Sequence, residues 1–320
     1  MTVVRQVLRQ VLRDVKREVL RADPNPFGNS FAMTIVTTGP SETFTLPGRD
    51  IGIYDADVDW TDGTPTSEIT TFNDPDLAHI YANADTQQLL VSKTFPSVFF
   101  NNAGDKLKVR SIENFGSIGW LTLELSFFGC INLVTVTSNV TNFDLVTSLA
   151  SAFRVTGIVI FNVLSGISMP LLTQMNLMIR NCPDLEVFDI SFLDAPQNIR
   201  LDFCCVDNAS MTTYIFTGTT IKPTTLAFFG QNNTLVTSVE GLDTVDISQM
   251  TNAANFMANG GSMTTAQYDA VLISFSGQTV QSAVSIHFGN SKFTSGGAAE
   301  AARSSLITND LWVITDGGAA

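Results

Sequence analysis

Carboxylates alternate with apolar residues in the segment 54–60, and a further carboxylate follows in the adjoining turn. The four are Asp55, Asp57, Asp59 and Asp62. Hard cations bind several oxygen ligands held close together, so this spacing raises the hypothesis of a calcium site. The segment does not fit an EF-hand loop, because counting from Asp55 places Trp60 where glycine is required and Thr66 where a bidentate glutamate is required. We favour a strand that turns its carboxylates to solvent, with calcium as the open alternative.

The remaining groups able to do chemistry are few and widely spaced. The histidines are His79 and His287, and the cysteines are Cys130, Cys182, Cys204 and Cys205. The cysteines form no C-x-x-C pair, so we expect free buried thiols of a reducing compartment. A nucleophilic cysteine needs a histidine partner, which no spacing here suggests. We therefore expect no catalytic residue, no metal and no cofactor, and we interpret both histidines as structural.

The composition predicts a folded, soluble protein. Of its 320 residues, 44% are hydrophobic and 15% are charged, which excludes disorder driven by excess charge. The longest apolar runs, such as 158–164, fall short of the roughly 18 residues that a membrane span needs. Arg5, Arg9 and Arg13 interrupt the first apolar residues, so we expect no secretory signal.

The net charge of −13 is unevenly distributed along the chain. Residues 1–22 contain six Lys or Arg and two Asp or Glu, a net charge of +4, which leaves −17 for the remainder. An acidic body repels phosphates and releases no counterions on contact with them. Nucleic acid is therefore not an expected partner.

Residues 1–22 are predicted to form an amphipathic helix of about five turns, separated from the body by a linker over 23–30. A single apolar stripe recurs at steps of four and three: Val4, Leu8, Val11, Val15 and Val19. A helix of this length is marginal alone, so the stripe must be buried. Packing against its own domain is one alternative, and lying on a membrane surface without Trp or Phe anchors is another. We favour docking on a partner scaffold or self-association, with which a trimer is compatible.

Residues 31–98 show the period-two pattern of strands. Short alternating segments are separated by the turn signals Gly39-Pro40 and Pro47-Gly48. This pattern predicts a small antiparallel β-sandwich.

Residues 99–262 repeat with a period of about 25. Strand-like triads begin at Leu107, Leu133, Ile158, Leu185, Thr212 and Leu235, at steps of 26, 25, 27, 27 and 23. A second apolar anchor recurs at Phe128, Phe153, Ile179, Cys204, Phe228 and Phe256. A unit of this length cannot bury its own apolar face, so we expect the units to stack as a solenoid. Cys130 and Cys182 each stand just before a strand, at a corner that a small polar or thiol side chain closes.

Residues 263–320 continue the repeats with helical return segments. Amphipathic helices are predicted over 264–275 and 298–307, and strands over 284–288 and 311–315, whose starts lie 27 residues apart. We expect an α/β cap that closes the solenoid. The predicted fold class is thus a β-rich α/β repeat protein, with a β-sandwich and an amphipathic helix before the repeats.

Several segments resemble known families. The segment VDWTDGT over 58–64 is similar to the V-x-W-G-D-G-S/T turn of PKD-like β-sandwich modules, with Thr61 in place of one glycine, and HIY over 79–81 is similar to their H-x-Y segment. The repeats resemble the BspA-like leucine-rich-repeat surface proteins. The ending resembles that of bacteriophage-encoded members found in tail or appendage proteins. The segments that carry these two resemblances are FFGCINL over 127–133, LDTVDISQMT over 242–251, YDAVL over 268–272, FGNSKFT over 288–294 and WVITDGG over 312–318.

The resemblance implies a non-enzymatic virion surface protein, a tail fibre or another appendage. Its N-terminal helix would attach it to other virion proteins, and its solenoid would engage a host surface glycan or protein. A bacterial surface or protein-interaction module is the alternative. A polysaccharide-cleaving tailspike is a third hypothesis, because glycosidases need two carboxylates about 5 to 10 Å apart. The acidic residues considered for that role are Asp144, Asp184, Glu186 and Asp189.

Overall fold

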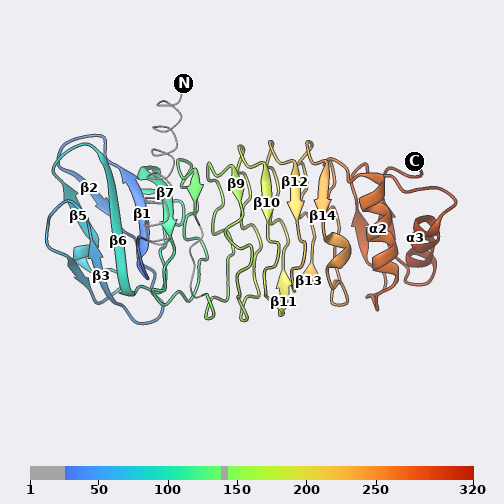
Figure 1. The fold of residues 1–320 in the computed structure, drawn as a ribbon, viewed down its shortest axis with the longest axis horizontal. Helices are drawn as coiled ribbons and strands as arrows, with labels where there is room; N and C mark the ends of the chain where they lie inside the picture. Colours follow the sequence, from blue (N-terminus) through green and yellow to red (C-terminus); the bar gives the residue numbers. More distant parts are fainter. Residues whose placement is uncertain (1–25, 138–142) are drawn as a thin grey trace, which may run out of the picture.

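In the computed structural model, which describes residues 26–137 and 143–320, the chain is extended along one axis (Figure 1). The described residues form sixteen strands and two α-helices, which confirms the predicted β-rich character. An antiparallel sheet lies at one end, the helices lie at the other, and short parallel strands occupy the middle (Figure 1). The predicted helix over 1–22, with the whole of its apolar stripe, falls outside the described residues.

The N-terminal region is built from antiparallel strands whose apolar residues alternate inward. Its strands are β1 (Phe31–Val36), β2 (Glu42–Thr45), β3 (Asp55–Asp59), β4 (Ser67–Ile69), β5 (Ala78–Tyr81) and β6 (Thr86–Thr94). Strands β4, β3, β6 and β1 are neighbours in one sheet, and β2 pairs with β5 in a second. On β3 the side chains of Ala56 and Val58 are buried, while Asp55 and Asp59 are exposed.

Strand β7 (Val109–Asn114) joins the antiparallel region to the repeats. It pairs antiparallel with β1 and parallel with β8 (Thr135–Val136). The six-stranded sheet therefore continues across residue 98 and ends at β8.

Parallel strands about 25 residues apart run along one side of the repeat region. They are β9 (Ile160–Phe161), β10 (Val187–Asp189), β12 (Thr213–Ile215) and β14 (Ser238–Glu240), paired in that order. A second ladder of bridges links Ser148, Gln174, Arg200, Thr225 and Asn252, and includes β11 (Asn198–Arg200) and β13 (Lys222–Thr225). We call each unit between successive positions of this second ladder a rung, and we count the equivalent units before Ser148 and after Asn252 with them. The predicted triads lie within a few residues of the observed strands.

Each rung bends at the same two positions by adopting the left-handed backbone conformation. The first position is Leu125, Ser151, Leu177, Phe203, Phe228 and Asn255, and the second is Gly129, Val155, Asn181, Asp207, Asn232 and Asn259, all with φ between 52° and 85°. Non-glycine residues pay about 1–2 kcal/mol for this conformation. Hydrogen bonds between rungs offset that cost, as where the Leu125 N–H donates to the Ala150 carbonyl at 2.9 Å.

The core is one continuous apolar cluster that runs from the first sheet to the C-terminal strands. Aromatic rings in contact thread the middle of it: Phe127, Phe153, Phe161, Phe188, Phe229, Phe256 and Phe288. The Phe127 and Phe153 rings stack at 5.5 Å, and those of Phe161 and Phe188 at 5.7 Å. Two predicted anchors are corrected, since Phe128 and Phe228 are only half-buried and their neighbours Phe127 and Phe229 fill the core.

At the C-terminal end, α-helices connect the parallel strands in place of the irregular segments of the rungs. Helix α2 (Thr265–Ser276) begins at Thr264, whose side chain and that of Gln267 form a capping box, and α3 (Ala298–Thr308) packs against it. Strands β15 (Ser285–His287) and β16 (Val313–Thr315) pair in parallel. Both predicted helices and both predicted strands are confirmed.

Candidate functional site

The carboxylates of the N-terminal sheet are held by partners of their own. Lys93 Nζ lies 2.7 Å from Asp57 Oδ1, and His79 Nε2 lies 2.8 Å from Asp62 Oδ2. The Thr61 N–H donates to Asp59 Oδ1 at 2.8 Å. Within residues 26–137 and 143–320, no three His, Cys, Asp or Glu side chains converge in a way that would hold a metal ion.

His79, on β5, packs against the turn that holds Trp60 and Asp62. Its ring stacks on that of Trp60 at 4.7 Å and 8°. Burial alone would raise the pKa of Asp62, but hydrogen bonds from Thr64 and His79 outweigh it and lower that pKa to about 2. Thr61, where the PKD-like pattern has a glycine, has a φ of 57°. The turn thus keeps a glycine-like backbone, held by side-chain hydrogen bonds.

The four cysteines are free and buried, as predicted. Burial raises the pKa of the Cys130, Cys182 and Cys205 thiols. Cys182 lies at a rung corner, where its Sγ is 3.3 Å from Thr156 Oγ1 and its N–H donates to Asn208 Oδ1 at 2.8 Å. A thiol that is protonated and excluded from solvent is a poor nucleophile, so the geometry supports a packing role.

The other residues singled out in the sequence lie apart. Asp184 and Glu186 are exposed near the start of β10, and Asp189 Oδ1 accepts the Ser191 N–H at 2.8 Å. Asp144 belongs to an earlier rung. His287 is half-buried on β15, and its Nδ1 accepts the Gly289 N–H at 3.1 Å.

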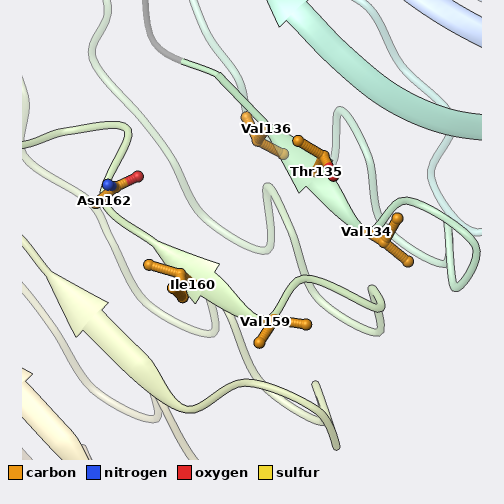
Figure 2. A pocket seen from close by; sticks show the side chains of 6 residues that line it. All are labelled: Val134, Thr135, Val136, Val159, Ile160 and Asn162. Atoms are coloured by element: carbon orange, nitrogen blue, oxygen red, sulfur yellow. The ribbon is translucent and has the colours of Figure 1, made fainter. Parts of the chain in front are cut away.

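An apolar hollow opens between β8 and β9 (Figure 2). We call it the β8–β9 groove, lined by Val134, Thr135, Val136, Val159, Ile160 and Asn162, with a volume of about 460 Å³. Val134 and Ile160 are each 51% exposed, and Val159 is 39% exposed. Figure 2 shows Ile160 on β9, and Val134 and Val159 at the ends of the two strands.

The groove exists because the two sheets end at its edges. Strand β8 is the last strand of the first sheet and β9 is the first of the next, and no pairing joins them in the described part of the chain. On the other side of the same rungs the backbone is closed, since the Leu123 N–H donates to the Ser148 carbonyl at 3.0 Å. Gly157 allows close approach at the corner, where a Cβ would lie 2.6 Å from the Ile131 carbonyl oxygen.

The lining favours recognition by apolar contact. None of the lining residues is charged, and only Thr135 and Asn162 offer polar groups. Fully burying a Val or Ile side chain contributes about 1.5–3 kcal/mol, and these side chains are about half exposed, so covering each one contributes about 1 kcal/mol. The groove is therefore suited to hold an uncharged apolar surface, which the Thr135 hydroxyl and the Asn162 amide would orient.

Sequence reasoning missed this groove, although a signal was present. Each parallel strand has two outward positions after a buried residue. At β8 and β9 these positions are mostly aliphatic: Val134-Thr135 and Val159-Ile160. Later in the chain they are mostly polar: Glu186-Val187, Thr212-Thr213 and Thr237-Ser238. The concentration of aliphatic residues at outward positions of two neighbouring repeats marks the site.

Two further findings bear on function. No helix in the described part of the chain is both long and apolar enough to cross a membrane. No family model, no curated protein and no solved structure matches the chain.

Proposed function

We propose that this chain is a non-enzymatic virion protein of a bacteriophage, part of a tail fibre or another appendage, that recognises a glycan or protein on the host surface. In this proposal residues 31–98 are a PKD-like module and residues 99–262 are a leucine-rich-repeat solenoid. The stripe of Val4, Leu8, Val11, Val15 and Val19 attaches the chain to other virion proteins or to copies of itself.

The observation that carries the proposal is the β8–β9 groove on a stiff, extended body. The rungs hydrogen-bond to one another along two ladders and share one aromatic core, so the groove is presented on a rigid support. Rigid surfaces lose little entropy on binding. Exposed aliphatic side chains on an otherwise polar strand face indicate a contact surface.

The composition of purified particles tests the assignment to the virion. Mass spectrometry is expected to find the chain in gradient-purified phage, and antibodies against the 31–98 region are expected to label one end of the particle. Val11→Asp and Val15→Asp in the full chain are expected to lower its incorporation at least tenfold, because a charge interrupts the stripe. Absence of the chain from purified particles would contradict the proposal.

A further inference from the structure

A row of arginine and phenylalanine side chains follows the second ladder. Phe128, Arg154 and Arg180 occupy equivalent positions on three successive rungs, 26 residues apart. The Arg154 guanidinium lies over the Phe128 ring at 4.8 Å from its centroid, and that of Arg180 lies 6.0 Å from the centroid of Phe203. The Phe203 ring in turn stacks on that of Phe228 at 4.5 Å and 4°.

One arginine of this row has no counter-charge. Three other arginines form salt bridges: Arg49 with Glu124 at 3.3 Å, Arg180 with Asp207 at 3.1 Å and Arg200 with Asp202 at 3.1 Å. No carboxylate in the described part of the chain forms a salt bridge with Arg154. Burial lowers the pKa of Arg154, as does the nearby Arg180. This face of an acidic protein therefore holds one uncompensated positive charge.

Three polar atoms of these rungs lack hydrogen-bond partners among the described residues. They are Arg154 Nε, Arg180 Nε and Asn176 Oδ1, and all three are excluded from solvent. Asn176 and Arg180 belong to one rung. Arg154 lies on the rung before, at the position equivalent to that of Arg180. A buried polar group without a partner costs about 1–3 kcal/mol. Three such atoms on adjacent rungs indicate a site adapted to something other than its own stability.

We propose that Arg154 and Arg180, flanked by Phe128 and Phe203, bind the carboxylate of an acidic saccharide. A guanidinium presents paired N–H donors that match a carboxylate, and packing on a phenyl ring fixes their direction. The half-buried Phe128 ring beside Arg154 offers an apolar surface that suits the C–H face of a sugar ring.

The charge balance selects among anionic ligands. The site carries a single excess positive charge, since Asp207 pairs with Arg180, and the carboxylates of Glu124 and Asp202 belong to the neighbouring rungs. A polyanion such as nucleic acid meets repulsion from these carboxylates and from the acidic body, whereas one carboxylate on a neutral sugar does not. The inference rests on the proposed host recognition and names the ligand class.

Binding to defined sugars tests the inference. The probes are uronate, sialate and Kdo oligosaccharides, each beside its carboxyl-reduced neutral form, titrated calorimetrically into the full chain. At least one acidic probe is expected to bind at least tenfold more tightly than its neutral form. Arg154→Gln is expected to weaken that binding at least tenfold and Arg154→Lys about fivefold, because lysine keeps the charge without the paired donors. Arg200→Gln, the control, is expected to change it less than twofold.

Several outcomes would overturn the inference. These are no binding of any acidic probe, equal binding of a neutral form, unchanged binding by Arg154→Gln, or displacement by inorganic phosphate at the saccharide's own concentration. Thermal unfolding of each variant verifies that the fold is intact. Where wild type and Arg154→Gln adsorb to host cells equally, the inference fails and the proposed function stands. Where the chain is missing from particles, the proposed function fails whatever the sugars show.

Discussion

Asn208 and Asn233 occupy the same corner of successive rungs, and the Asn208 N–H donates to Asn233 Oδ1 at 2.7 Å. Asn208 Oδ1 accepts the Cys182 N–H at 2.8 Å, which extends the contact to the rung before. Its Nδ2 also donates to the carbonyls of Ile179 and Cys205. Side-chain atoms at this buried corner thus hold the backbones of three rungs together.

Asn208→Ala is expected to lower the free energy of unfolding by about 3 kcal/mol, because it leaves a buried N–H and two buried carbonyls without this partner. Urea denaturation followed by circular dichroism measures the change. The control is Asn309→Ala at the exposed end of α3, where φ is −91° and alanine fits; a change within about 0.5 kcal/mol is expected. Equal effects of the two variants would contradict the corner's role.

Gly261→Ala is expected to cost about 3 kcal/mol of stability through steric overlap between rungs. A Cβ at this position would lie 1.8 Å from the Val236 carbonyl oxygen, so backbone has to move. Gly277→Ala is the control, because Gly277 has a φ of −84° and its nearest atom to a Cβ is 3.4 Å away. Thermal unfolding compares the two. A Gly261→Ala protein as stable as wild type would mean that these rungs are not in contact.

The buried thiols are expected to resist modification in the folded protein. All four cysteines are buried, so a thiol reagent such as DTNB at pH 8 is expected to react at least 100-fold more slowly than in 6 M guanidinium, where four thiols per chain are released. Rapid reaction of any thiol in the native state would contradict the burial of the corners.

The contact that Asp62 makes with Thr64 and His79 is expected to make stability acid-sensitive. The pKa of Asp62 lies near 2 in the folded chain against an ordinary value of 3.8. A lowered carboxyl pKa gives stability that is fully present above about pH 4 and is lost as the pH falls toward about 2. Asp62→Asn removes this contribution, so its free energy of unfolding is expected to fall less than that of wild type across the interval.

Urea denaturation at each pH measures the difference in the free energy of unfolding between wild type and Asp62→Asn. Asp76→Asn, a substitution at an exposed carboxylate that forms no salt bridge with any described residue, is expected to follow wild type. Parallel curves for wild type and Asp62→Asn would show that the contact contributes nothing.

The sequence was sufficient to place the strands of the repeats. A buried residue recurs at Leu133, Ile158 and Leu185 as predicted, because burial of one side of a short strand is a local, repeated requirement. In the last two repeats the buried residues are Met211 and Val236, one position away from the predicted Thr212 and Leu235. The helices α2 and α3 were equally predictable, because apolar spacing defines them. The second anchor was misplaced at Phe128 and Phe228, because each adjoins another Phe and apolar type alone does not tell which of the two points inward.

The bends could not be predicted from residue types, and the groove was missed because its edges depend on which strands pair. Residues as different as Leu125, Val155 and Phe203 adopt positive φ, so the bend is imposed by hydrogen bonds between rungs and not by residue type. The segments LVTV over 133–136 and IVIF over 158–161 both favour strands, yet β8 and β9 do not pair with each other. Pairing depends on how adjacent rungs approach, which is a property of the assembled structure. The arginine row was missed because its members are 26 residues apart in the sequence and come together only when the rungs stack.

Inhibition of phage adsorption by the purified chain tests host recognition through the β8–β9 groove most directly. Wild-type protein is expected to compete with the phage for host cells, and Ile160→Asp is expected to need at least tenfold more protein, because it removes an aliphatic contact worth about 1 kcal/mol and puts a charge in its place. Leu235→Asp, a substitution at a residue 55% exposed and outside the groove, is expected to match wild type. No competition by the wild-type chain, or equal competition by Ile160→Asp, would contradict recognition through this groove.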